Sequence, residues 1–449
     1  MTEPTTMSAT ATATEDTRET EAALDFETFA ARLDQPDDLL AARRAAWERY
    51  LELPFPTRKS EEWRYTDLAK IEFASYAPVA PGGETDEGLP APVEDVLARS
   101  GERSGVVVQR NGRVVHVELD PGVAAKGVVL CSLETAAAEH PELLERALYE
   151  ARPEPMEEKL WTLHQAFLTG GYLLRIPKNV KLDAPVHVFR LIDRPGALVS
   201  THSLVVAETG AEGAVIDEFV SEPLDALSLH AAIVDGGDNA TVDYVALQRY
   251  GRGVKHFSIQ HLKANRDTQL RTFNVQLGAD LSRADISSRL LGPGCSSEML
   301  ALWLGDGDQH FDHHTIQHHA APSAHSDLLF KGALADKASS VFRGLIRVDK
   351  GAQLTDAYQT NRNLLLSDEA HATSLPNLEI EADDVRCSHG STTGPVDEMQ
   401  LFYLTSRGLT HDQAERLLVL GFFEEVLGRI PVTGVRGRLL KAIEEKTGL

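Results

Sequence analysis

The stretch TFNVQL, residues Thr272–Leu277, decides the fold, because its apolar and polar side chains alternate strictly. Phe273, Val275 and Leu277 share one face and the intervening residues share the other, which is the period of a β-strand. NLEIEA, residues Asn377–Ala382, alternates in the same way. Both stretches lie in residues 172–393, where short β-rich runs are separated by glycine-containing turns.

No helical pattern interrupts residues 172–393. This excludes alternating βαβ folds and leaves a large sandwich, a barrel or a β-helix. A propeller would show a sequence repeat for each blade, and we find none. The length of the region and its irregular glycine spacing favour a β-helix, in which each strand pairs with the coil below it.

The regions on either side contain helical patterns and one hairpin. Asn111-Gly112 separates two β-branched runs, which predicts a type I′ turn. Ser132 offers a helix N-cap, and Thr410 with Gln413 has capping-box spacing. We therefore expect a disordered tail (1–24), an N-terminal helical region with a β-hairpin (25–171), a β-helix core (172–397) and a C-terminal helical region (398–449).

Composition excludes several classes of protein. The 449 residues are 42% hydrophobic and 25% charged, as in ordinary soluble proteins. The net charge of −24 repels phosphate backbones, so we expect no nucleic-acid partner. We expect no membrane association and a cytoplasmic location, because no apolar run approaches the ~20 residues of a membrane span and the N-terminus does not resemble a secretory signal.

The three cysteines are Cys131, Cys295 and Cys387. They form no CxxC pair and no disulfide framework. A cluster held within one chain usually needs four thiolates, so three scattered thiols cannot hold one alone. We expect no cofactor bound by the chain by itself.

The segment DQHFDHHTIQHH, Asp308–His319, contains five histidines and two aspartates. On a strand, His310, Asp312 and His314 share a face that could ligate zinc or iron. Histidines lie on both faces, however, so only part of the segment could serve one ion. The alternative is stacked polar side chains, each hydrogen-bonded to a neighbour one coil away. Alanine replacement of His310 and His314 with unchanged bound iron would exclude the metal hypothesis.

Three segments resemble the SufB/SufD family of iron–sulfur cluster assembly proteins, in its SufD form. They are TRKSEEWRYTDL (Thr57–Leu68), SSVFRGLIRVDKGAQLTDAYQTNRNLLLS and NLEIEADDVRCSHGSTTGPVDEMQLFYLTSRGL (Asn377–Leu409). The resemblance implies a right-handed parallel β-helix between helical terminal regions. It also implies a heterodimer with a SufB-like subunit and docking of a SufC-like ABC ATPase by the C-terminal helices. It implies no catalytic turnover, and the chain has no GxxxxGK[ST] loop.

The family resemblance also separates SufD-like from SufB-like chains. A SufB-like scaffold carries a cysteine at the place that matches about Asn361 here. Because no thiol stands there, the resemblance favours the partner that lacks the main scaffold thiol. A SufB-like scaffold that holds the nascent cluster is the alternative.

Cys387 and His389 are candidate metal ligands at a subunit interface. Residues two apart on a strand face the same side, so a thiolate and an imidazole could converge on one ion. Two ligands do not complete a tetrahedral site, and a partner would have to supply the rest. By resemblance, His389 matches a SufD histidine at the SufB interface, where iron or a cluster could be shared transiently. The alternative is a buried cysteine beside a hydrogen-bonded histidine.

The C-terminal helices carry an apolar stripe, including Leu417, Phe422 and Val426, that we predict to bind a partner. Truncation after Leu409 should then abolish ATPase binding and leave the β-helix folded. In the N-terminal region, Trp63 and Tyr65 are expected to anchor the helices on the β-helix.

Two further possibilities concern function and assembly. Many β-helices are polysaccharide-cleaving enzymes that use carboxylate pairs or Asp-bound Ca²⁺. This chain's longest polar cluster is instead rich in histidine, and no acid–base pair can be identified. Whether the isolated chain forms a homodimer is left open by the sequence.

Overall fold

The computed structural model describes residues 24–33, 35, 37–80, 93–94, 102–148, 157–430, 432 and 435–447. The tail expected for residues 1–24 lies outside the described residues except for Leu24, which is buried. Within these ranges, no helix is both long and apolar enough to cross a membrane.

The named helices are α1 (Phe26–Ala30), α2 (Asp37–Glu52), α4 (Pro121–Ala124), α5 (Leu133–Glu139), α6 (Pro141–Leu148), α7 (Glu158–Ala166), α8 (Glu398–Ser406), α9 (His411–Leu427) and α10 (Val435–Thr447). Short 3-10 turns are η2 (Glu61–Trp63), η3 (Leu68–Lys70) and η4 (Phe73–Ser75). The strands are β1 (Ala77–Pro78), β2 (Gly105–Arg110), β3 (Arg113–Leu119), β4 (Val129–Ser132), β5 (Gly170–Ile176), β6 (Val186–Leu191), β7 (Ala197–Ala207), β8 (Glu212–Val220), β9 (Ala226–Gly236), β10 (Thr241–Arg249), β11 (Val254–Ala264), β12 (Gln269–Gln276), β13 (Leu281–Leu290), β14 (Ser296–Gly305), β15 (His310–His319), β16 (His325–Leu334), β17 (Ser339–Val348), β18 (Thr355–Leu365), β19 (His371–Ile380) and β20 (Val385–Pro395).

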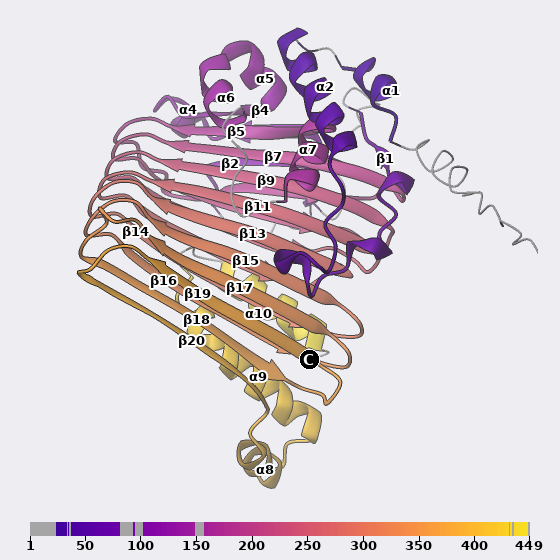
Figure 1. Cartoon of the computed structure of the whole chain (residues 1–449), viewed down its shortest axis with the longest axis vertical. Coiled ribbons are helices and arrows are strands. Elements are labelled where there is room, and N and C mark those ends of the chain that lie inside the picture. The colour runs from indigo at the N-terminus through magenta and orange to yellow at the C-terminus, as the bar shows by residue number, and fades with distance from the viewer. Residues whose placement is uncertain are drawn as a thin grey trace, which may run out of the picture.

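The strands from β5 to β20 wind into a parallel β-helix with two faces (Figure 1). The odd-numbered strands from β5 to β19 form one sheet, which we call the odd sheet. The even-numbered strands from β6 to β20 form the other, the even sheet. Each strand pairs in parallel with the strand two places later, as in Tyr244 opposite Thr272 and His314 opposite Arg343. The β-helix predicted from the sequence is confirmed.

The predicted hairpin is also present, and it extends the β-helix toward the N-terminus. Asn111 and Gly112 have φ values of 49° and 85°. Positive φ at both central residues is what a type I′ turn requires. Strand β2 continues the even sheet by pairing in parallel with β6, and β4 pairs antiparallel with β5 on the odd sheet. The even sheet therefore includes a strand that begins at Gly105, within the N-terminal region (25–171) that was expected to contain the β-hairpin.

The predicted helix caps are found. The Ser132 side chain accepts from the Thr135 N–H at the start of α5, and Thr410 with Gln413 forms a capping box at α9. The N-terminal helical region begins with α1 and α2.

The alternating stretch of β12 has its apolar face on the outside of the β-helix. Phe273 and Val275 pack in one cluster with Val426 of α9 and Ile443 of α10. Asn274 instead aligns with Ala301, which belongs to the cluster inside the coils. The C-terminal helices therefore cover an apolar outer face of the even sheet, and truncation after Leu409 would expose that face. The expectation that such a truncation leaves the β-helix intact is not supported by this packing.

The N-terminal helices and the segment after them cover the outer face of the odd sheet. Phe26 and Phe167 pack in a cluster with Leu198, Leu229 and Phe257 of the odd strands. Residues 54–80, which we call the strap, then run along the odd sheet and return to it where β1 pairs with β7 (Figure 1).

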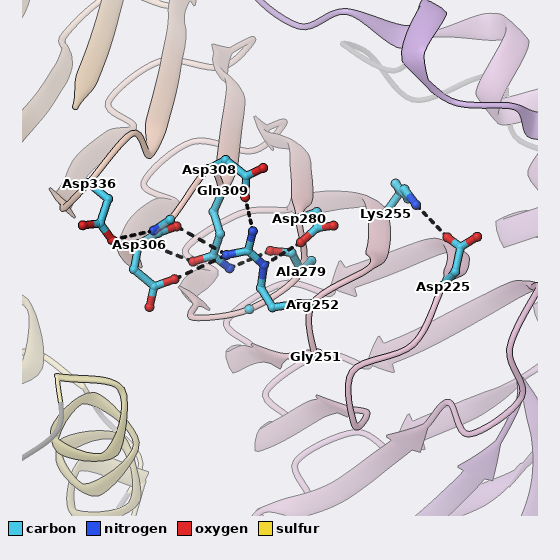
Figure 2. A network of polar contacts seen from close by, with 12 residues as sticks. Asp225, Gly251, Arg252, Lys255, Ala279, Asp280, Asp306, Asp308, Gln309 and Asp336 are labelled. Carbon is cyan, nitrogen blue, oxygen red and sulfur yellow. Dashed lines mark hydrogen bonds and ion pairs between the residues drawn. The ribbon is translucent and has the colours of Figure 1, made fainter. Parts of the chain in front are cut away.

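One corner of the β-helix is held by stacked acidic residues around a single arginine. The Arg252 guanidinium bonds Asp280 at 2.6 Å and also contacts Asp306 and Asp308 (Figure 2). Lys446 of α10 lies 3.7 Å from the same Asp306 carboxylate. Successive coils and the last helix are therefore joined at this corner through opposite charges.

Candidate functional site

The last coil of the β-helix is open on one side. Strands β19 and β20 stand at the ends of their sheets, so within the described residues their outer edges pair with no further strand. Leu378 and Ile380 of β19 align with Ile346 and Val348, which are fully buried one coil earlier. In the last coil the corresponding side chains are 37% and 39% exposed. The interior of the β-helix therefore reaches the surface at this end.

Cys387 and His389 lie on β20 at this open end. They stand opposite Ala357 and Gln359 of β18, which are buried, so both side chains belong to the inward-facing set. Cys387 is half-buried against Ala357 and Ala382, whereas His389 is exposed. Burial and the nearby Asp356 carboxylate raise the pKa of the Cys387 thiol. A protein bound at the open end could reach both residues, which is what ligands at a subunit interface require. A metal role for Cys387 and His389 stays a prediction.

The position expected to carry a thiol in a SufB-like scaffold is a buried amide. Asn361 is fully buried, and its Oδ1 accepts a 2.9 Å hydrogen bond from Asn363. Of the other thiols, Cys295 is fully buried and Cys131 lies on β4 at the opposite end of the β-helix. Within the described residues, Cys387 is therefore the thiol that a partner on the open end could approach.

His310 and His314 point outward from β15, where the strap covers them. Thr66 of the strap lies 2.8 Å from His310 Nε2 and donates to Asp312 at 2.6 Å. Arg283 of β13 donates to Asp312 at 2.9 Å and lies 3.2 Å from His314 Nδ1. A guanidinium therefore occupies the centre of this group.

The charges of this group also favour a structural network. Burial opposes ionisation of Asp312, but the Arg283 guanidinium and His314 hold its pKa well below the usual range. His310 also bonds Ser339 of the next coil at 2.7 Å, as the stacked-network alternative requires. Among the described side chains, no group of three or more His, Cys, Asp or Glu residues is arranged to hold a metal ion. A metal role for His310 and His314 stays an untested prediction.

The two aromatic residues predicted to anchor the N-terminal region on the β-helix differ in how deeply they are buried. Trp63 is 1% exposed, its ring lies 3.8 Å from the Arg283 guanidinium carbon, and its Nε1 donates to Glu157 at 3.0 Å. Tyr65 is 42% exposed. The anchor role is therefore confirmed for Trp63 and wrong for Tyr65.

The apolar stripe on α9 is not a single exposed surface. Leu417 is 50% exposed, Phe422 is half-buried, and Val426 is completely buried against the even sheet. The prediction that Val426 binds a partner is thus wrong in this structure, because the β-helix itself covers that side of the helix.

Sequence reasoning missed a more exposed group on α8. Met399, Phe402 and Tyr403 are 74%, 68% and 56% exposed, and no residue of α8 is buried. Three large apolar side chains within five residues of a helix were the available signal. We call these three side chains the α8 surface.

Comparisons with known proteins show which family the chain resembles. Residues 190–422 match the family described as SUF system FeS cluster assembly, SufBD core domain, and residues 102–188 match the SufBD protein N-terminal region. The iron-sulfur cluster assembly protein SufD of Bacillus subtilis is 30% identical over 427 residues, covering 94% of this chain and 97% of that relative. A SufBD family protein of Synechocystis is 29% identical over 420 residues, covering 91% of each chain.

A third relative supports the same assignment over a shorter part of the chain. An iron-sulfur cluster assembly SufBD family protein of Mycobacterium tuberculosis is 37% identical over 305 residues, which cover 63% of this chain and 73% of that relative. The chain belongs to the SufBD family of iron–sulfur cluster assembly proteins.

Proposed function

We propose that this chain is a non-catalytic, SufD-type subunit of an iron–sulfur cluster assembly complex. Its open last coil pairs with a SufB-like subunit, and its α8 surface docks a SufC-like ATPase. The observation that carries the proposal is the open end of the β-helix, where the inward-facing residues Leu378, Ile380 and His389 are exposed.

An open end of this kind favours a protein partner. The edges of β19 and β20 present backbone N–H and C=O groups that another strand can pair with. Leu354 and Tyr358 add exposed apolar surface beside the edge, at 60% and 48%. Contiguous exposed apolar surface on a folded protein marks interaction sites. A partner coil stacked here would satisfy the backbone groups and bury the apolar side chains together.

The same end supplies an incomplete set of metal ligands. Zinc-type sites take four ligands, and β20 offers the Cys387 thiol and the His389 imidazole. The raised pKa of Cys387 favours a protonated thiol in the free chain. A metal ion lowers the pKa of a thiol that it binds and releases the proton. Iron or a nascent cluster, as the cargo of the complex, would therefore be shared with the SufB-like partner.

The α8 surface is suited to the second partner. α8 contacts α9, and α9 in turn packs on β14 and β16, so the exposed apolar side chains stand on a supported element. Because α8 itself buries no residue, its sequence is not explained by packing within the chain. Docking to an ATPase through Phe402 and its neighbours would explain the exposed side chains.

The two surfaces can be separated by single substitutions. We would co-express the chain with its SufB-like and SufC-like partners, purify the complexes without oxygen and measure subunit composition by native mass spectrometry. Ile380→Asp should abolish pairing with the SufB-like subunit and leave binding of the ATPase intact. Phe402→Asp should abolish binding of the ATPase and leave pairing with the SufB-like subunit intact. Leu51→Asp is the matched control, since Leu51 is 57% exposed on α2 and should change neither. Normal pairing by the Ile380→Asp chain would refute the proposed interface.

The metal role needs a readout of its own. In a complex that assembles normally, His389→Ala should lower bound iron, and Cys387→Ser should lower it similarly. Exposed Ser391, on the same side of β20, provides the control substitution Ser391→Ala, which should leave iron unchanged. Full iron loading of the His389→Ala complex would exclude His389 as a ligand while leaving the pairing proposal intact.

The isolated chain offers a second test of the open end. Without a SufB-like partner, the exposed edge and apolar residues favour association of two copies through the same surface. Sedimentation of the purified chain should show a concentration-dependent dimer that Ile380→Asp converts to monomer. A dimer that survives this substitution would use another surface.

A further inference from the structure

A pocket of about 250 Å³ lies between the N-terminal helices and the beginning of the odd sheet. Leu39 of α2, Leu133 of α5, Leu144 of α6 and Trp161 of α7 supply its apolar walls. Ligand pockets in proteins combine such walls with a few polar groups that orient the bound molecule. The pocket is remote from β20 along the chain, and neither partner surface described above includes its walls.

Two buried histidines supply the polar part of the wall. His164 of α7 and His202 of β7 both line the pocket, and each is 1% exposed. His164 Nε2 lies 3.4 Å from His202 Nδ1. His202 Nε2 has no hydrogen-bond partner in the described structure. A buried polar atom without a partner costs free energy, so this nitrogen favours a ligand that can bond to it.

The hydrogen-bond network determines whether His202 Nε2 donates or accepts a hydrogen bond. The Ser200 hydroxyl donates to the His164 carbonyl oxygen at 2.9 Å, because a carbonyl can only accept. His164 Nδ1, 2.8 Å from the same hydroxyl oxygen, must then carry the proton and donate. In a neutral imidazole this leaves His164 Nε2 as acceptor, so His202 Nδ1 donates to it. His202 Nε2 is consequently left as a hydrogen-bond acceptor.

The surroundings favour an uncharged molecule. Burial lowers the pKa of His202 to about 3, and it lowers the pKa of His164 well below its ordinary value, so both rings are neutral near pH 7. The charged residues that line the pocket are Arg43 and Glu134, one of each sign. Arg43 Nε already donates to Gln35 at 2.9 Å. Because these two charges are of opposite sign, the lining has no net charge that would select for an anion or a cation.

We propose that this pocket binds a neutral, largely apolar small molecule that carries a hydroxyl group, a phenol or an alcohol, whose O–H donates to His202. The helices hold the apolar body, and the imidazole selects for the donor. Binding requires neither partner subunit, so the isolated full-length chain is sufficient for a test.

The probes are 4-propylphenol and 4-propylanisole, which share an apolar body but differ in the O–H donor. Affinities would be measured by ligand-observed NMR and calorimetry on the full chain. We expect the phenol to bind about tenfold more tightly, the effect of one hydrogen bond to a buried acceptor. Equal affinities of the two probes, or no binding of the phenol, would overturn the proposal.

Two variants connect the affinity difference to the pocket. His202→Phe keeps a ring of similar size but removes the acceptor, so the preference for the phenol should disappear. Ala138→Trp places a bulky side chain at an exposed residue of the pocket lining and should abolish binding of both probes. Binding that is unchanged by Ala138→Trp would place the probes elsewhere and refute the assignment. The comparison of the two probes on the unmodified chain stands even if either variant fails to fold.

Discussion

Buried neutral histidines should make this chain unusually sensitive to acid. Burial lowers the pKa of six of them from the usual 6.5 to about 3 or 4. These are His187, His202, His256, His261, His313 and His319. Most lie inside the coils or under the terminal helices, where water does not solvate an imidazolium.

The sign of the effect follows from proton binding. Between pH 6.5 and pH 4, the unfolded chain protonates these histidines and the folded chain does not. Stability falls with decreasing pH wherever the unfolded state binds more protons. The contribution of each neutral histidine is therefore complete above pH 6.5 and is lost as the pH falls toward its folded pKa.

The free energy of unfolding that is lost in mild acid is large compared with the stability of a typical domain. At pH 5.5, a histidine whose pKa falls from 6.5 to about 4 loses roughly 1.4 kcal/mol of stabilisation, and the six together lose roughly 8 kcal/mol. Native proteins are stable by only about 5–15 kcal/mol. We therefore expect cooperative unfolding in mild acid, near pH 5.

His187 allows the reasoning to be tested at one residue. It is 2% exposed, neither of its ring nitrogens has a hydrogen-bond partner, and Arg438 and Arg103 add to the lowering of its pKa. His187→Leu should remove about one proton from the pH dependence and gain about 1.4 kcal/mol relative to the parent chain at pH 5.5. Neighbouring Phe189→Leu is the control, because it alters packing without altering titration.

The assay is urea unfolding followed by tryptophan fluorescence between pH 8 and pH 4.5. The free energy of unfolding should fall steeply below pH 6.5 in the parent and in Phe189→Leu, and less steeply in His187→Leu. A parent curve that is flat between pH 6.5 and pH 5 would refute the claim that these rings are buried and neutral. Identical slopes for the parent and His187→Leu would refute it for His187.

Three further predictions concern packing and the C-terminal helix. Trp63→Ala should cost about 4 kcal/mol by emptying the fully buried site under the strap, measured by urea unfolding. Gly332→Ala should lower the free energy of unfolding by about 2 kcal/mol, because a Cβ at this position would lie 2.2 Å from the Trp303 ring. The control Gly351→Ala should be nearly neutral, because a Cβ there would meet open space. Burial lowers the pKa of Lys446 to about 8, so parent stability should rise between pH 8 and pH 10 and Lys446→Met should flatten that rise in thermal melts.

Local signals in the sequence were sufficient to predict individual turns and helix caps. The type I′ turn at Asn111-Gly112 and the capping box at Thr410 depend on a few adjacent residues, and both are found as predicted. The pairing of β2 with β6 was not foreseen, because the helices α4 to α7 lie between these two strands in the sequence. Pairing over such a distance leaves no local pattern.

Helical periodicity could not reveal which apolar residues of the C-terminal region remain exposed. An apolar stripe requires a surface to cover it but does not say whether that surface is in the same chain. Val426 packs on the even sheet because the outer face of β12 is apolar. No residue of α8 is buried, so the apolar side chains of this helix remain exposed.

Alternation of apolar and polar residues within a strand also could not indicate which face of the strand points into the β-helix. The residues that face inward in the last coil are the ones that a partner at the open end would contact. Both faces of β12, for example, are buried, one inside the coils and one under helices. At the open end, β19 presents apolar Leu378 and Ile380, while β20 presents His389, Ser391 and Thr393. A purely apolar helical cap would leave the polar residues of β20 without hydrogen bonds, at a cost for each buried group. The surface therefore favours a second β-helix end, which can offer strand edges, apolar contacts and hydrogen-bonding side chains at once.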